Sequence, residues 1–135
     1  MKIGLVRHFK ISASISKAFM NSREFAIWAK KYEDSGVERG DIIEVLTHWP
    51  KCICSSSTRT VETATLLYGH NIEKMDLIRE VPIGPVFETR IRLPFLFWLI
   101  FGRIAWLFCH RSQPESAKET IKRVKTFIEN SNLIL

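Results

Sequence analysis

Two arginines and a histidine lie where the sequence predicts the ends of secondary-structure elements. Arg7 and His8 directly follow the short apolar run Ile3-Gly4-Leu5-Val6, which we expect to be a buried parallel strand. Open α/β sheets bind their ligands at the carboxyl ends of such strands. Arg59 follows Ser55-Ser56-Ser57-Thr58 in the first turn of an expected helix, beside backbone N–H groups that attract an anion. These side chains indicate a phosphate site; a structural histidine and a solvated arginine are the alternatives.

Short apolar segments and helical patterns alternate along the chain and would position these residues. The segment Asn21-Ser22-Arg23-Glu24 predicts the capped start of the first helix, and Gly36 its glycine cap. Gly69 is expected to end the helix that carries Arg59. The predicted order is strand 2–6, helix 23–34, helix 41–47, strand 51–55, the Arg59 helix, edge strand 76–80, and a last helix through Ile128 with a capping box at Ser112-Gln113-Pro114-Glu115.

Composition limits the class of protein. A chain of 135 residues with 46% hydrophobic residues can bury one core, so we expect one domain. The net charge of +6 favours anionic partners, but the basic residues are scattered and no aromatic residues interleave with them, which argues against nucleic acid. Cys52, Cys54 and Cys109 lack metal-ligand spacing and are expected to be buried thiols. Without a signal peptide, the chain is expected in the cytoplasm, and no metal or organic cofactor is indicated.

The segment from Ile91 to Cys109 is almost entirely apolar and rich in aromatic residues. Arg92, Pro94 and Arg103 interrupt it, and an arginine inside a bilayer is costly, so a membrane-spanning helix is disfavoured. We expect an insertion that covers the site as a lid or packs on a partner. Contact with a membrane surface is the remaining alternative.

Three segments in order carry a resemblance to a known family. They are Leu5-Val6-Arg7-His8, then Ser55-Ser56-Ser57-Thr58-Arg59 followed by Glu62-Thr63-Ala64, and Leu77-Ile78-Arg79-Glu80 followed by Gly84. This order resembles the histidine phosphatase superfamily, whose fold is phosphoglycerate-mutase-like. The resemblance implies a three-layer α/β/α sandwich with a mainly parallel sheet over residues 1–135. It also implies an incomplete C-terminal strand from Leu133 and an aromatic-rich insertion at about 91–110.

The resemblance also implies a role for each site residue. His8 would attack a small phosphomonoester and become phosphohistidine, and Arg7 and Arg59 would bind the phosphoryl oxygens. Glu80 would protonate the leaving alcohol and later activate water. Such chemistry needs cations for the negative oxygens and a neutral nucleophile, which imidazole supplies. A domain that binds a phosphorylated ligand without hydrolysing it is the alternative.

The chain departs from the family pattern at three places. Phe9 follows the histidine where the family has glycine, and no Glu-Gly follows Gly84, although Glu88 is near. The family also needs a second histidine after a later strand. His48, His70 and His110 do not stand in such a context. We therefore expect that the chain stops before this residue and that the 135 residues alone have little activity.

Overall fold

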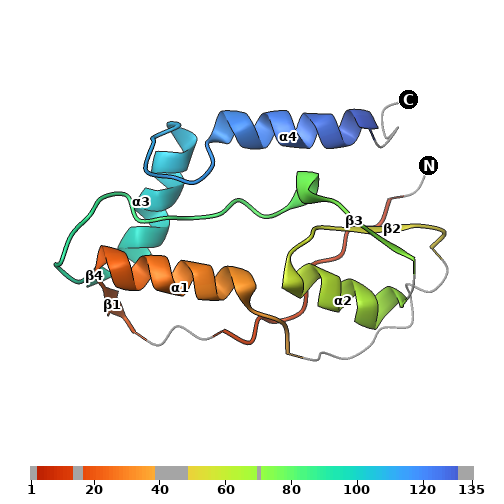
Figure 1. The fold of residues 1–135 in the computed structure, drawn as a ribbon, viewed down its shortest axis with the longest axis horizontal. Coiled ribbons are helices and arrows are strands. Elements are labelled where there is room, and N and C mark those ends of the chain that lie inside the picture. Colours follow the sequence, from red (N-terminus) through yellow and green to blue (C-terminus); the bar gives the residue numbers. More distant parts are fainter. Residues whose placement is uncertain (1–2, 14–16, 39–48, 70, 131–135) are drawn as a thin grey trace.

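The computed structural model describes residues 3–13, 17–38, 49–69 and 71–130 (Figure 1). It is a mixed α/β arrangement in which helices are joined by short strands. The helices are α1 (Ser22–Asp34), α2 (Thr58–Tyr68), α3 (Phe95–Leu107) and α4 (Ala117–Asn130). The strands are β1 (Phe19–Met20), β2 (Cys52–Cys54), β3 (Ile72–Lys74) and β4 (Leu93–Pro94), and a 3-10 helix spans Asp76–Ile78.

The strands form two small sheets. β2 and β3 pair in parallel, with Cys52 opposite Ile72, and β1 and β4 pair antiparallel. The expected strand at 51–55 is thus confirmed in β2. The expected strand over residues 3–6 is wrong, because this segment is not part of any strand and the Leu5 side chain is 95% exposed. A buried parallel strand needs a hydrogen-bonded neighbour, and none of the described strands pairs with residues 3–6.

The expected edge strand at 76–80 is also wrong. The strand beside β2 is β3, and the last bond across this pair runs from the Met75 N–H to the Cys54 carbonyl at 2.8 Å. The chain then turns into the 3-10 helix, in which the Arg79 N–H donates to the Asp76 carbonyl. Glu80 therefore follows a turn and lies on an irregular segment.

α1 begins where the sequence predicts. Asn21 accepts a hydrogen bond from the Glu24 N–H, and the Glu24 carboxylate accepts one from the Asn21 N–H. The predicted glycine cap is wrong, because Ser35 ends the helix in an extended conformation. A Cβ on Gly36 would lie 2.6 Å from an oxygen of Glu62, so the missing side chain is what lets α2 approach the end of α1.

α2 agrees with its prediction at both ends. It begins at Thr58, after Ser57, which places Arg59 in its first turn, and it ends at Gly69. The φ of Gly69 is 89°, a backbone conformation that favours glycine. The predicted helix 41–47 and the predicted strand from Leu133 lie outside the described residues.

The aromatic segment supplies the core. Met20, Phe25, Phe95 and Trp98 form a buried cluster between α1 and α3. The Trp98 indole donates a hydrogen bond of 2.8 Å to the Met20 carbonyl, so its polar atom is satisfied. Within the described residues, no helix combines the length and the apolarity that a bilayer crossing requires.

α4 starts one turn later than its expected cap. The reciprocal bonds join Ser116 and Glu119, so the predicted capping box at 112–115 is wrong. Glu115 is instead buried in an ion-pair network. Among the cysteines, Cys54 is buried, but Cys109 is exposed at the end of α3, against expectation.

Candidate functional site

Arg59 is buried and holds two other segments together. Its side chain is 4% exposed, and its Nε and Nη2 donate to the two oxygens of Glu80 at 3.1 and 2.7 Å. Nη1 donates to the carbonyls of Tyr32 and Glu33, both at 3.2 Å. These carbonyls belong to the last turn of α1, which carries a partial negative charge. Arg59 is therefore not a solvated arginine on the surface of α2.

His8 lies on the other side of the Glu80 carboxylate. Its Nε2 is 3.2 Å from Glu80 Oε1, and its Nδ1 is 2.7 Å from the Phe9 carbonyl. A carbonyl oxygen only accepts, so Nδ1 carries a proton and donates it. Nε2 then faces a carboxylate oxygen, which also accepts. The contact therefore requires one further proton between Nε2 and Oε1.

Glu80 is partly exposed and is held in its ionised form. Burial raises the pKa of its carboxyl group, but the hydrogen bonds and the charge of Arg59, together with His8, lower it more, so the net shift is downward. Oε1 lies between Arg59 Nε and His8 Nε2, and Oε2 accepts from Arg59 Nη2. Glu80 thus occupies the position between a cation and an imidazole nitrogen that an anionic ligand would need.

Thr63 fixes the histidine segment to α2, a role that sequence reasoning missed. Its hydroxyl accepts from the Phe9 N–H at 3.1 Å and donates to the Arg59 carbonyl at 2.8 Å. The residue is buried and lies one turn after Arg59. The motif Glu62-Thr63-Ala64 contained this signal, because a threonine that bonds back to the preceding turn leaves its oxygen free to accept.

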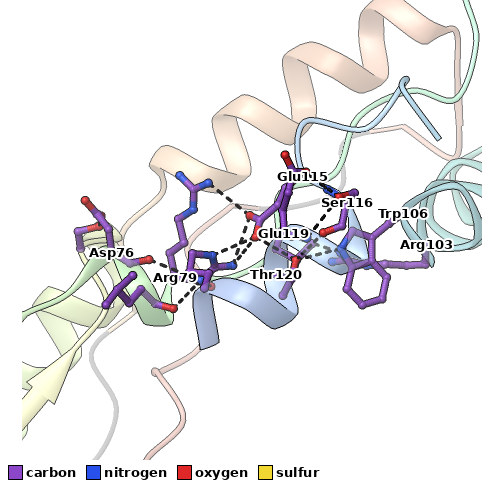
Figure 2. A network of polar contacts seen from close by, with 12 residues as sticks. Asp76, Arg79, Arg103, Trp106, Glu115, Ser116, Glu119 and Thr120 are labelled. Carbon is purple, nitrogen blue, oxygen red and sulfur yellow. Dashed lines mark hydrogen bonds and ion pairs between the residues drawn. The ribbon is translucent and has the colours of Figure 1, made fainter. Parts of the chain in front are cut away.

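Arg123 of α4 and the buried Glu115, which precedes this helix, hold the segment that carries Glu80. Arg123 Nη1 donates to the carbonyls of Leu77 and Arg79 at 2.8 and 3.0 Å, and its Nε donates to Glu115 at 2.9 Å. Arg79 pairs with the same carboxylate at 3.3 Å. Figure 2 shows Glu115 between its partners. The backbone before Glu80 pairs with none of the described strands, and Arg123 satisfies its carbonyls instead.

The segment after Glu80 is anchored in a second way. The Gln113 amide donates to the Gly84 carbonyl and accepts from the Gly84 N–H, both at 3.1 Å. Gly102 of α3 packs closely against Ile83, where an added Cβ would lie 2.8 Å from Cδ1. Glu80 therefore stands on a short segment that is fixed at both ends.

The structure does not bring every expected residue into this cluster. Arg7 is exposed, and across residues 3–13, 17–38, 49–69 and 71–130 its guanidinium has no ion pair or hydrogen bond. Glu88 is exposed as well. His110 is exposed beyond the end of α3 and bonds to Ser112, while His48 and His70 lie outside the described residues.

α3 does not cover the site. It packs against Phe25 near the beginning of α1, whereas Arg59 binds the carbonyls at the end of α1 (Figure 1). In the structure α3 thus does not lie over Arg59 as a lid would, and Phe95 and Trp98 of this segment are buried in the core instead. In the described part of the chain, no three histidine, cysteine or acidic side chains are grouped to hold a metal ion.

Comparison of the chain with family models, with curated proteins and with solved structures found no match. The geometry of Arg59, Glu80 and His8 is therefore the basis for proposing a function.

Proposed function

We propose that this protein is a histidine phosphatase that hydrolyses a small phosphomonoester through phosphohistidine at His8. The observation that carries the proposal is the contact of three groups from distant parts of the sequence. His8, Arg59 and Glu80 come from the N-terminal segment, α2 and the irregular segment, and one carboxylate joins all three. An anion-binding guanidinium, an imidazole and a carboxyl group are the parts this reaction needs.

The contacts support a sequence of steps. The phosphoryl oxygens take the place of the Glu80 carboxylate on Arg59, and the proton between Glu80 and His8 moves to Glu80. His8 Nε2, now with a free electron pair, attacks phosphorus while the bond to the alcohol oxygen breaks. Glu80 gives its proton to that oxygen. Water then attacks the phosphohistidine, Glu80 accepts a proton from it, and phosphate leaves.

The remaining parts of the proposal follow the family resemblance. Arg7 supplies a second cation for the phosphoryl oxygens. The proposed fold is a three-layer α/β/α sandwich, and the proposed location is the cytoplasm. We expect slow turnover by the 135 residues alone, because His48, His70 and His110 do not stand in the sequence context that the family's second histidine needs. Nucleic acid is not expected as a partner.

Binding of a phosphate ligand without hydrolysis is the second candidate function. It is favoured by the bidentate contact of Arg59 with Glu80 and by the lowered pKa of Glu80, which keep the carboxyl group ionised rather than ready to donate a proton. Both functions use the same residues, and the formation of a covalent intermediate distinguishes them.

The test is chemical quenching of the chain during incubation with a radiolabelled aryl phosphate. We expect an acid-labile, base-stable label that peptide mapping assigns to His8. It is absent from His8→Ala and strongly reduced in Arg59→Gln. His110→Ala is the matched control, because His110 is exposed and lies outside the cluster. Saturable binding of inorganic phosphate without label would assign the binding function, and the absence of both would overturn the proposal.

A further inference from the structure

α3 exposes an apolar face that has no partner within the described residues. Its buried side chains are Phe95, Trp98, Gly102 and Ala105, which pack on the core. The exposed large side chains of α3 and its cap are Leu96, Ile100, Phe101, Ile104, Leu107 and Phe108, with exposed fractions between 43% and 77%. At 3.6 residues per turn these six fall within an arc of roughly 140° on the side opposite the core. Figure 1 shows α3 crossing one end of the molecule.

The segment around this face is basic and contains no carboxylate. Residues 90–114 include four arginines and no aspartate or glutamate. Arg103 lies at the edge of the apolar arc and reaches the Val81 carbonyl, and Arg92 pairs with Glu24. Arg90 and Arg111 are exposed before and after the helix. Cations therefore flank the apolar face at both ends.

We infer that α3 binds the surface of an anionic lipid bilayer, lying flat with its apolar arc among the acyl chains. A helix of 13 residues is about 20 Å long, too short for a hydrocarbon core of about 30 Å, but sufficient for binding in the interface. Arg90 and Arg111 then meet the lipid phosphates, which the long arginine side chain can reach from an apolar surface. The charge pattern selects anionic over neutral lipid.

A second copy of the chain fits this face less well. In a two-fold symmetric dimer the same patch meets itself, so the arginines beside one α3 would approach those beside the other. No carboxylate within residues 90–114 would compensate them. Attachment through α3 also leaves the candidate site accessible, because Arg59 lies at the other end of α1. The inference is independent of the proposed phosphatase activity.

The first test is flotation of the full chain with phosphatidylcholine vesicles that contain or lack phosphatidylserine. We expect binding only to the vesicles with phosphatidylserine, and weaker binding at high salt. The variant Leu96→Gln/Ile100→Gln/Leu107→Gln should bind at least about tenfold less, since each of these side chains transfers from water to lipid. The matched control is Ile27→Gln/Ile121→Gln/Val124→Gln, which removes three exposed apolar side chains from α1 and α4 and should bind as the wild type does. Circular dichroism verifies that every variant is folded.

The second test addresses charge. Arg90→Gln/Arg111→Gln should weaken binding to the phosphatidylserine vesicles severalfold, whereas Lys30→Gln/Lys125→Gln, which removes the same charge from other exposed positions, should change it less. Equal binding of both charge variants, binding to neutral vesicles, or no binding by the wild type would overturn the inference. A dimer in light scattering that is lost in the α3 variant, without vesicle binding, would assign the face to a second copy.

Discussion

Replacement of Glu80 by glutamine should strengthen phosphate binding and slow hydrolysis strongly. In the ligand-free site the carboxylate occupies two nitrogens of Arg59 and faces Nε2 of His8. A phosphate group that binds Arg59 must displace this carboxylate and then remains close to its negative charge. Glutamine keeps the size of the side chain and removes its charge. No carboxylate then competes with phosphate for Arg59, and no carboxyl group is left to protonate the leaving alcohol.

The size of the effect follows from charge and exposure. Two unit charges about 4 Å apart repel by about 4 kcal/mol at an effective dielectric constant of about 20. The Glu80 side chain is 45% exposed and can turn toward water, which reduces the penalty to about 1–1.5 kcal/mol. This corresponds to a dissociation constant for inorganic phosphate that is about tenfold lower in Glu80→Gln. Loss of a general acid should slow hydrolysis by about a hundredfold or more.

Titration calorimetry with inorganic phosphate and a label-formation assay measure the two effects. The pKa of Glu80 lies below the usual 4.5, so the carboxylate competes at every pH above this value. The difference between wild type and variant should therefore persist at neutral pH and shrink as the pH falls through the lowered pKa. Glu73→Gln is the control, because Glu73 pairs with Lys51 on the exposed side of β3.

Two results would refute this reasoning. Weaker phosphate binding by Glu80→Gln would mean that the carboxylate organises Arg59 for the ligand rather than competing with it. Unchanged label formation and hydrolysis in Glu80→Gln would remove Glu80 from the proposed mechanism.

Three further predictions concern the structure around the site. Glu115→Gln should lower the free energy of unfolding in urea by about 2–4 kcal/mol, because two arginines lose their buried partner. Burial raises the pKa of Glu115, but its arginines and Thr120 lower it more, so the net shift is downward. The contribution of Glu115 to the free energy of unfolding is therefore complete above about pH 4.5 and is lost as pH falls through the lowered pKa. Acid unfolding that is the same in Glu115→Gln and in the wild type would contradict this. Gly102→Ala should cost about 1–3 kcal/mol by overpacking against Ile83, and equal stability in urea would show that this contact can relax. Trp98→Phe should cost about 2–4 kcal/mol, since the core loses volume and the indole bond to the Met20 carbonyl; a change below 1 kcal/mol in thermal unfolding would contradict the buried role.

Local sequence signals predicted the elements that depend on a few neighbouring residues. The capping box of Asn21 and Glu24 defined the start of α1, and Gly69 defined the end of α2. The placement of Arg59 in the first turn of a helix followed from the same kind of signal. Caps and glycine conformations act over three or four residues, so they can be recognised without knowing the fold.

Contacts between distant segments could not be predicted in this way. The spacing in the sequence does not say that Arg59 binds the last carbonyls of α1 and the Glu80 carboxylate. The aromatic run of α3 gave no sign of which side chains would form the core, since almost every position is apolar. The ion pair of Glu115 with Arg123 was not predicted, because a carboxylate near the start of a helix is normally interpreted as part of a capping box.

The sequence by itself determined the residue types that suggest a phosphate site, and the helix that carries Arg59. Only the tertiary structure decided that Glu80 lies between Arg59 and His8, and that residues 3–6 pair with none of the described strands. The physical reason is the range of the forces involved. Helix ends are set by hydrogen bonds within one turn, whereas ion pairs and strand pairing depend on which distant segments the core brings into contact.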